Sequence, residues 1–156
     1  CIINPLHMTL DFTPAKDCIK NYSDSILAKK ECNDCVVRAF AAAADWSYDA
    51  AHRFVSDEFG REPKKGTPRF KSTMAQLVND KRRVNRKKLT TISDTEMKNG
   101  SSRMTVGQFV KFYDKGTFII VISRHAFTIR DGVVIGGNRE DSKRMRCIIK
   151  GVWKVG

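Results

Sequence analysis

The sequence predicts an α+β fold, in which helices come first and an antiparallel sheet follows. Residues 33–60 have apolar residues at helical spacing, with capping residues at the ends. From residue 117 onward the apolar residues are β-branched or aromatic and lose that spacing, which is typical of strands. At 156 residues the chain has the length of one domain. We therefore predict a single domain over residues 1–156, with residues 1–30 as an N-terminal extension.

Two helices are expected in the first half of the chain. Asn33 is a good N-cap, and the residues after it, up to Ala44, are apolar nearly all round, so this helix should be buried and central. Ser47 caps a second helix, which Gly60 ends. The second helix is amphipathic, with apolar residues at helical spacing: Tyr48, Ala51, Val55 and Phe59.

The second half changes from helix to sheet. Thr105 and Gln108 form a capping box that opens a helix over residues 106–113. Residues 117–123 predict a strand, and Asp131-Gly132 predicts a two-residue hairpin between two short strands. Residues 145–155 predict a closing strand.

Positive charge is concentrated in the middle of the chain. The formal net charge is +12, and residues 61–104 contain 13 Lys and Arg against 4 Asp and Glu, a net of +9. We interpret 61–104 as a basic, loop-rich insertion with one short helix near residues 72–80. Because cations attract phosphates, we expect nucleic acid or another polyanion to bind its densest part without sequence preference. That part consists of Lys81, Arg82, Arg83, Arg86, Lys87 and Lys88.

The number of cysteines and the lengths of the apolar runs indicate the cellular compartment of the protein. Five scattered cysteines, an odd number, favour a reducing compartment. No apolar run approaches the roughly 18 to 20 residues of a membrane span, so we expect no membrane partner. The first residues lack the features of a signal peptide, and the chain begins with Cys1 instead of methionine, which we interpret as trimming or processing.

Cys35 is the candidate nucleophile. Counted from the Asn33 cap it is the second helical residue, where free N–H groups and the helix dipole stabilise a thiolate. A thiolate nucleophile needs a partner, most often histidine. His52 lies inside the amphipathic helix and His7 lies in a segment without a clear prediction, whereas His125 opens a strand and is held rigidly.

The segments "NDCVVRAFAAAADWSYDAAHRFV" and "TVGQFVKFYDKGTFIIVISRHAFTIRDGVV" resemble papain-like cysteine peptidases, in particular the small bacteriophage-encoded proteins of that fold. The resemblance implies a papain-like fold, in which an N-terminal buried helix with the cysteine packs on a C-terminal antiparallel sheet with the histidine. It implies a protein or peptide substrate. We expect no cofactor and no metal. With the cysteine pattern it implies the cytoplasm of an infected host, or a virion.

Carried onto this chain, the resemblance makes Cys35 the nucleophile and His125 its base. Asn138 is our choice for the third member, with Asp141 in reserve because it lies in a charged stretch that we expect to be solvated. The family's oxyanion amide is represented only by Asn33. Arg124 stands where such proteins often have glycine.

Other readings remain open from the sequence. Cys32 and Cys35 have the spacing of half a zinc site or of a redox pair, but further ligands at matching spacing and a preceding strand are not visible. The main alternative is a non-enzymatic nucleic-acid-binding or virion-associated protein on an inactivated peptidase fold, with the basic segment as its working surface.

Overall fold

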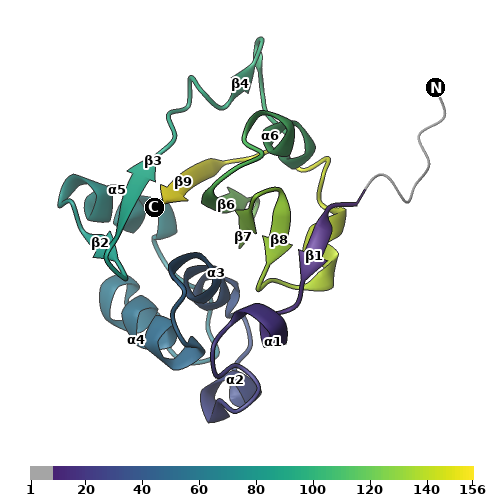
Figure 1. The fold of residues 1–156 in the computed structure, drawn as a ribbon. Coiled ribbons are helices and arrows are strands. Elements are labelled where there is room, and N and C mark those ends of the chain that lie inside the picture. The colour runs from purple at the N-terminus through teal and green to yellow at the C-terminus, as the bar shows by residue number, and fades with distance from the viewer. Residues whose placement is uncertain (1–8) are drawn as a thin grey trace.

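The computed structural model describes residues 9–156 and shows a mixed α+β fold (Figure 1). Its main sheet has seven strands in the order β1-β8-β7-β6-β9-β3-β2. Those strands are β1 (Asp11–Thr13), β2 (Arg83–Val84), β3 (Lys87–Thr91), β6 (Thr117–Ile122), β7 (His125–Arg130), β8 (Val133–Ile135) and β9 (Gly151–Val155). A separate pair comprises β4 (Lys98–Asn99) and β5 (Ser102–Arg103). The helices are α1 (Ala15–Cys18), α2 (Ile26–Lys30), α3 (Cys35–Ala44), α4 (Tyr48–Phe59), α5 (Phe70–Asn79) and α6 (Val106–Phe112), with a short 3-10 helix η2 (Arg139–Lys143).

Helix α3 is the buried central helix, as predicted. Its alanines are small enough for the helix to lie close to the sheet, and they are buried from Ala41 to Ala44. Two side chains of β7 fasten it there. Thr128 Oγ1 donates to the Ala39 carbonyl at 2.7 Å, and Arg130 Nη2 donates to the Ala42 carbonyl at 3.0 Å. The middle and the last turn of α3 are therefore fastened to β7.

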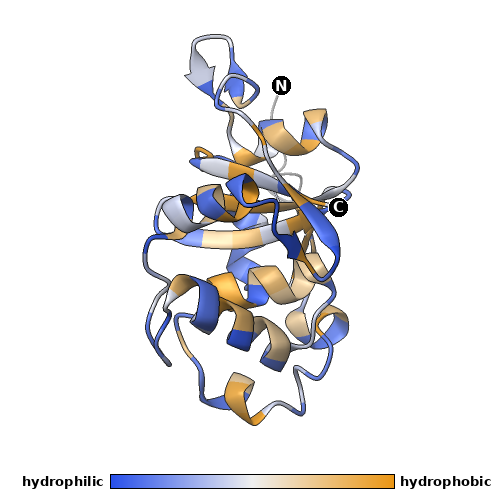
Figure 2. Ribbon diagram, turned by 90° about the vertical axis from the view of Figure 1, so that its left-hand side faces the viewer, coloured by the Kyte–Doolittle hydropathy of each residue, from blue (hydrophilic) through white to orange (hydrophobic). Residues whose placement is uncertain are grey.

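The main sheet is covered on both faces. In β6, Ile119 packs into the cluster of buried residues formed with α3 and α4, whereas Phe118 and Ile120 pack into a second cluster with Phe109 of α6. Burial on both faces explains why this strand is a continuous apolar run without alternation. In Figure 2 the hydrophobic colour is concentrated where helices meet the sheet, and most of the outer loops are hydrophilic.

Four local signals are confirmed. Ser47 Oγ accepts from the Ala50 N–H at the start of α4, and Gly60 ends that helix in the left-handed conformation with φ 68°. The capping box of Thr105 and Gln108 opens α6. Asp131 and Gly132, with φ 50° and 80°, form the turn between β7 and β8.

The N-terminal segment differs from our expectation of a separate extension. Residues 11–13 form β1, which pairs with β8 in parallel, so the sheet is mixed and not wholly antiparallel. Ala15 and Ile19 belong to the buried core. The alternation in this short stretch is too brief to indicate a strand. Cys1 and His7 lie outside the described residues.

The basic segment 61–104 is also part of the sheet. Strand β3 pairs with β9, with Leu89 opposite Val155, and α5 buries Met74 and Leu77. The strand was missed because Leu89 is its one buried residue among lysines and threonines. The predicted closing strand over residues 145–155 is limited to Gly151–Val155. Within residues 9–156, no helix has the length and apolarity needed to cross a membrane.

Replacing Ile119 with alanine should test the packing at the centre of the sheet. Ile119 is fully buried in β6, so its truncation leaves a cavity and should lower the free energy of unfolding by about 2–5 kcal/mol. Urea denaturation measures the change. Ile26→Ala is the matched control, because Ile26 is 68% exposed on α2 and its loss should cost less than about 0.5 kcal/mol. Equal losses in the two variants would contradict this core.

Candidate active site

Cys35 is the first residue of α3, one position earlier in the helix than predicted. The N-cap is Asp34, whereas Asn33 adopts a left-handed conformation with φ 53° just before it. The Asn33 side chain lines the cleft beside Cys35, but its amide donates to the Lys64 carbonyl at 3.1 Å. Asn33 is thus neither the helix cap nor a fully available oxyanion donor.

The Asp34 side chain is bound by two other side chains, those of Arg38 and Tyr48. One carboxylate oxygen lies 3.3 Å from Arg38 Nη2, and the other accepts from the buried Tyr48 hydroxyl at 2.8 Å. It does not cap the first turn of α3. Because the first N–H groups of a helix have no intrahelical acceptor, those of Cys35 and Val36 remain available where both residues line the cleft.

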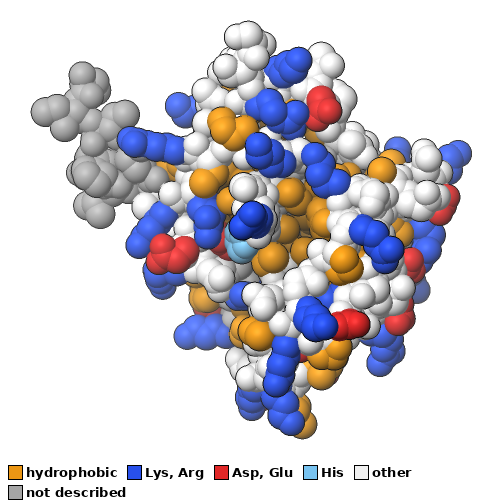
Figure 3. Space-filling model, turned by 180° about the vertical axis from the view of Figure 1, so that it is seen from behind, with side chains coloured by type: hydrophobic (Ala, Val, Ile, Leu, Met, Phe, Trp, Pro, Cys, Tyr) orange, Lys and Arg blue, Asp and Glu red, His pale blue; other side chains and the backbone are white. Residues whose placement is uncertain are grey.

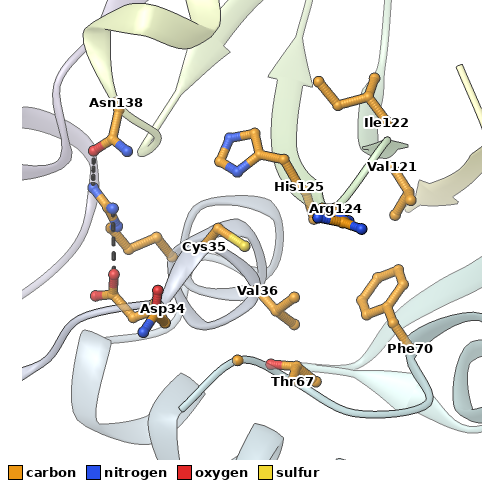
Figure 4. A pocket seen from close by; sticks show the side chains of 14 residues that line it. Asp34, Cys35, Val36, Thr67, Phe70, Val121, Ile122, Arg124, His125 and Asn138 are labelled. Carbon is orange, nitrogen blue, oxygen red and sulfur yellow. Dashed lines mark hydrogen bonds and ion pairs between the residues drawn. The ribbon is translucent and has the colours of Figure 1, made fainter. Parts of the chain in front are cut away.

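His125 is the first residue of β7 and is oriented by Asp141. Its Nε2–H donates to Asp141 Oδ1 at 2.6 Å, and the Asp141 side chain is fully buried. With Nε2 occupied, Nδ1 is the ring nitrogen left for Cys35. Figure 4 shows the Cys35 sulfur and the His125 ring pointing into one cleft. The structure therefore brings together a thiol, an imidazole and a carboxylate.

Asn138, our first choice for the third member, is not bound to His125. Its side-chain oxygen accepts from Arg38 Nη1 at 2.9 Å, a hydrogen bond that a dashed line from Asn138 marks in Figure 4. The reserve residue, Asp141, holds that place, and our expectation that it is solvated was wrong. Asn138 is instead the N-cap residue of η2, and its backbone N–H donates to Asp141 Oδ2 at 2.9 Å. This tight turn brings the buried Asp141 carboxylate to the His125 ring.

The three groups shift one another's proton affinities. Burial raises the pKa of Cys35, but hydrogen bonding to His125 and to the Ala126 backbone, with the nearby positive charges, brings it below the usual thiol value. Burial lowers the pKa of His125, but its bonds to Asp141 and Cys35 raise it to about 9. Burial raises the pKa of Asp141, and its bonds to His125, Asn138 and Arg144 bring it below its usual value. Both the lowered pKa of Cys35 and the raised pKa of His125 favour a thiolate–imidazolium pair over the neutral thiol and imidazole.

The cleft around these groups has a volume of about 430 Å³. One wall is apolar and is made by Val36, Phe70, Val121 and Ile122. In Figure 3 hydrophobic side chains floor a hollow that is ringed mostly by Lys and Arg. An extended peptide could lie across such an opening with its carbonyl near the Cys35 sulfur.

The other candidate residues lie apart from this cleft. His52 Nε2 is 3.8 Å from Glu31, which also binds the buried Arg61. His52 therefore belongs to a structural cluster with these two residues. Cys32 is exposed and close to the Lys64 carbonyl, at 3.5 Å. In the part of the chain that the structure describes, no group of three His, Cys, Asp or Glu side chains is placed to hold a metal ion.

The predicted basic run only partly forms one surface. Arg82 pairs with Glu58 at 2.5 Å, and Lys87 lies 3.3 Å from Asp45. Neither Lys87 nor Arg86 lines the hollow of about 450 Å³ at this side of the molecule. Its lining residues are Val78, Lys81, Arg82, Arg83, Lys88, Leu89 and Thr90.

Sequence reasoning missed several residues that build the site. Arg144 Nε donates to Asp141 Oδ1 at 3.1 Å, and Arg38 holds both Asp34 and Asn138. Tyr48 was predicted as a core residue, and its hydroxyl also positions Asp34. A signal for Arg144 exists in the sequence, because it stands three residues after Asp141 within one helical turn.

Comparison of the chain with protein-family models, with curated proteins and with solved structures finds no match to any of them.

The pH dependence of alkylation should show whether Cys35 is activated. Iodoacetamide reacts with the thiolate, so Cys35 should react at a pH well below about 8.5, the usual thiol pKa. In His125→Ala the partner is lost, and the midpoint of the Cys35 rate profile should move up. Peptide mapping by mass spectrometry resolves each site, and Cys32, which is exposed, serves as an internal control. Identical profiles for Cys35 and Cys32 would contradict an activated thiol.

Proposed function

We propose that this chain is a papain-like cysteine peptidase, or a related amide-bond hydrolase, that uses Cys35, His125 and Asp141. One observation carries the proposal: a thiol at an uncapped helix start shares a cleft with an imidazole whose other nitrogen is held by a buried carboxylate. A structural histidine would not need its ring fixed toward a thiol. The pKa directions of Cys35 and His125 both favour the ion pair that such catalysis requires.

In the first half of the reaction, the Cys35 thiolate attacks the carbonyl carbon of the substrate amide. The carbonyl oxygen becomes negative and can accept hydrogen bonds from the N–H groups at the start of α3, near Cys35 and Val36. His125 gives its Nδ1 proton to the amine nitrogen as the carbon–nitrogen bond breaks. The amine product leaves, and the acyl group stays on sulfur as a thioester.

In the second half, neutral His125 takes a proton from water at Nδ1 while the water oxygen attacks the thioester carbon. The carbon–sulfur bond breaks, the carboxylic acid product leaves, and the thiolate and imidazolium are restored. Asp141 keeps Nε2 protonated and the ring oriented through both halves. Each step uses groups of the chain and water.

The papain-like and phage-type assignments are part of this proposal. They are supported by the order of the elements, with the cysteine at the start of a buried helix, the histidine at the start of a sheet strand, and the carboxylate after the next strand. The same resemblance carries the proposed location in the cytoplasm of an infected host, or in a virion.

Replacing Asp141 with asparagine should separate its role from that of Asn138. Without the carboxylate the pKa of His125 should fall from about 9. The imidazolium then loses its proton at a lower pH, so the alkaline limb of the pH–activity profile should move to lower pH. We expect kcat/KM on peptides found with a proteome-derived library to fall about 10²-fold or more in Asp141→Asn. Asn138→Ala should lose far less, and Cys35→Ala should have no activity.

Glu140→Gln is the matched control for charge, because Glu140 is an exposed neighbour of Asp141. Glu140→Gln should leave both kcat/KM and the alkaline limb of the pH–activity profile unchanged. The assignment of Asp141 would be wrong if two results came together: Asn138→Ala lost as much activity as Asp141→Asn, and the alkaline limb of Asp141→Asn stayed at the wild-type pH.

A second candidate function is polyanion binding at the hollow beside α5, either alone on an inactivated peptidase fold or together with peptidase activity. The observation that favours it is that Lys81, Arg83 and Lys88 converge on one concavity without forming an ion pair among the described residues. Its floor contains Val78 and Leu89. Phosphates would bind these cations, and sequence preference is not expected.

Polyanion binding should follow the residues of this hollow. In Lys81→Gln/Arg83→Gln/Lys88→Gln, the slope of log affinity for single-stranded DNA against log salt should flatten by about two to three. The matched control is Lys29→Gln/Lys30→Gln/Arg53→Gln, which removes three exposed cations from α2 and α4. Equal slopes in both triple variants, measured by fluorescence anisotropy, would mean that the hollow is only a solvated surface. Alkylation of Cys35 should be the same in both.

A further inference from the structure

The rim of the active-site cleft contains an arginine whose charge the protein does not neutralise. Arg124 lines the cleft, is exposed, and makes no ion pair or hydrogen bond with the described residues. The other lining arginine, Arg38, is paired with Asp34 at 3.3 Å. Asp34 is the only carboxylate among the lining residues and is already bound to Arg38 and Tyr48. A ligand in this cleft therefore meets one uncompensated positive charge.

Arg124 is held next to the reacting groups by the backbone. It is the second residue of the two-residue turn between β6 and β7, with Ile122 paired opposite His125. Its φ of 58° is left-handed, a conformation that a non-glycine residue adopts at some cost. Figure 4 shows its side chain among those that line the cleft, beside His125. A group bound at Cys35 cannot avoid its field.

More cations gather at the apolar end of the cleft. Lys150 donates its backbone N–H to the Val121 carbonyl at 2.7 Å, and Val121 lines the cleft. Lys71 Nζ and Arg103 Nη2 both donate to the Lys150 carbonyl, at 2.8 and 3.2 Å. Asp94 compensates Arg103, whereas Lys71 and Lys150 form no ion pair within residues 9–156. These residues do not line the cleft, but Lys71 and Arg103 bring their charges to the backbone beside Val121.

We infer that the cleft selects acidic peptides, and that Arg124 binds an Asp or Glu side chain of the substrate close to the bond that is cleaved. The part of this inference that concerns peptide substrates rests on the proposed peptidase function. The effect of the Arg124 charge applies to any reagent that reaches Cys35. Arginine suits this role because its planar guanidinium can bind a carboxylate through two parallel hydrogen bonds. Lys71 and Lys150 would favour further acidic residues on the same side.

The alkylation of Cys35 by two reagents of different charge tests the electrostatic part. Iodoacetate is an anion and iodoacetamide is neutral, and both react with the same thiolate, so their rate ratio cancels changes in thiolate fraction. In Arg124→Glu the iodoacetate-to-iodoacetamide ratio should fall about five- to tenfold, because a positive charge near the sulfur becomes negative. Arg53→Glu is the matched control, since Arg53 is exposed on α4 and does not line the cleft, and its ratio should stay at the wild-type value.

Cleavage of a proteome-derived peptide library tests the substrate part. The wild-type enzyme and Arg53→Glu should cut peptides enriched in Asp or Glu next to the cleavage site, and a peptide with Glu changed to Gln there should be cut more slowly. In Arg124→Glu this preference should vanish. Circular dichroism and the thermal midpoint check that the variant is folded.

The two arms separate the two possible failures. If peptides are cleaved but Arg124→Glu leaves the alkylation ratio or the peptide preference unchanged, the role of Arg124 is overturned and the peptidase proposal stands. If the alkylation ratio falls as expected but no peptide of the library is cleaved, the charge selection of the cleft stands and the peptidase proposal fails.

Discussion

The buried carboxylate of Asp141 joins the strand that carries His125 to the turn that follows β8. It accepts hydrogen bonds from the His125 ring, the Asn138 backbone and Arg144, and none of it is exposed. A carboxylate is buried at such cost only when it is paired and hydrogen-bonded. Gly137 must lack a side chain for this arrangement, because a Cβ there would collide with Asp141 Oδ2. The same contacts therefore fold the turn and orient the histidine.

The thiol is held as firmly as the imidazole, but by a different set of contacts. Helix α3 is fastened to β7 along its length, and Asp34 ties the residue before Cys35 to the buried Tyr48. Glu31 adds a second tie, because it binds the buried Arg61 and the Lys64 N–H. Since the Asp34 carboxylate is used by Tyr48 and Arg38, it does not cap α3. The N–H groups that face the cleft are free as a consequence of how the loop is fixed.

The sequence predicted the parts of this structure whose signals are local. The pattern over residues 33–60 predicted two helices and placed Cys35 in the first of them to within one residue. The pair Asp131-Gly132 predicted the hairpin that follows His125. What depends on distant pairing was not predictable: β1 and β3 carry too few apolar residues to stand out before their partners β8 and β9 are known. The choice of Asn138 over Asp141 failed for a related reason. A charged stretch suggests solvent, and only the turn at Gly137 shows that one of its carboxylates points inward.

The net charge of the chain gives a physical reason for a carboxylate, and not an amide, beside His125. The chain has a formal charge of +12 and Arg124 lines the cleft, and a positive field stabilises the Cys35 thiolate but disfavours the imidazolium. A side-chain amide could orient the ring but would add no negative charge to offset that field. Asp141 supplies both the orientation and the negative charge, because it lies 2.6 Å from Nε2 in a place where solvent does not screen it. Asp141 thus keeps His125 protonated at neutral pH although Arg124 lines the same cleft.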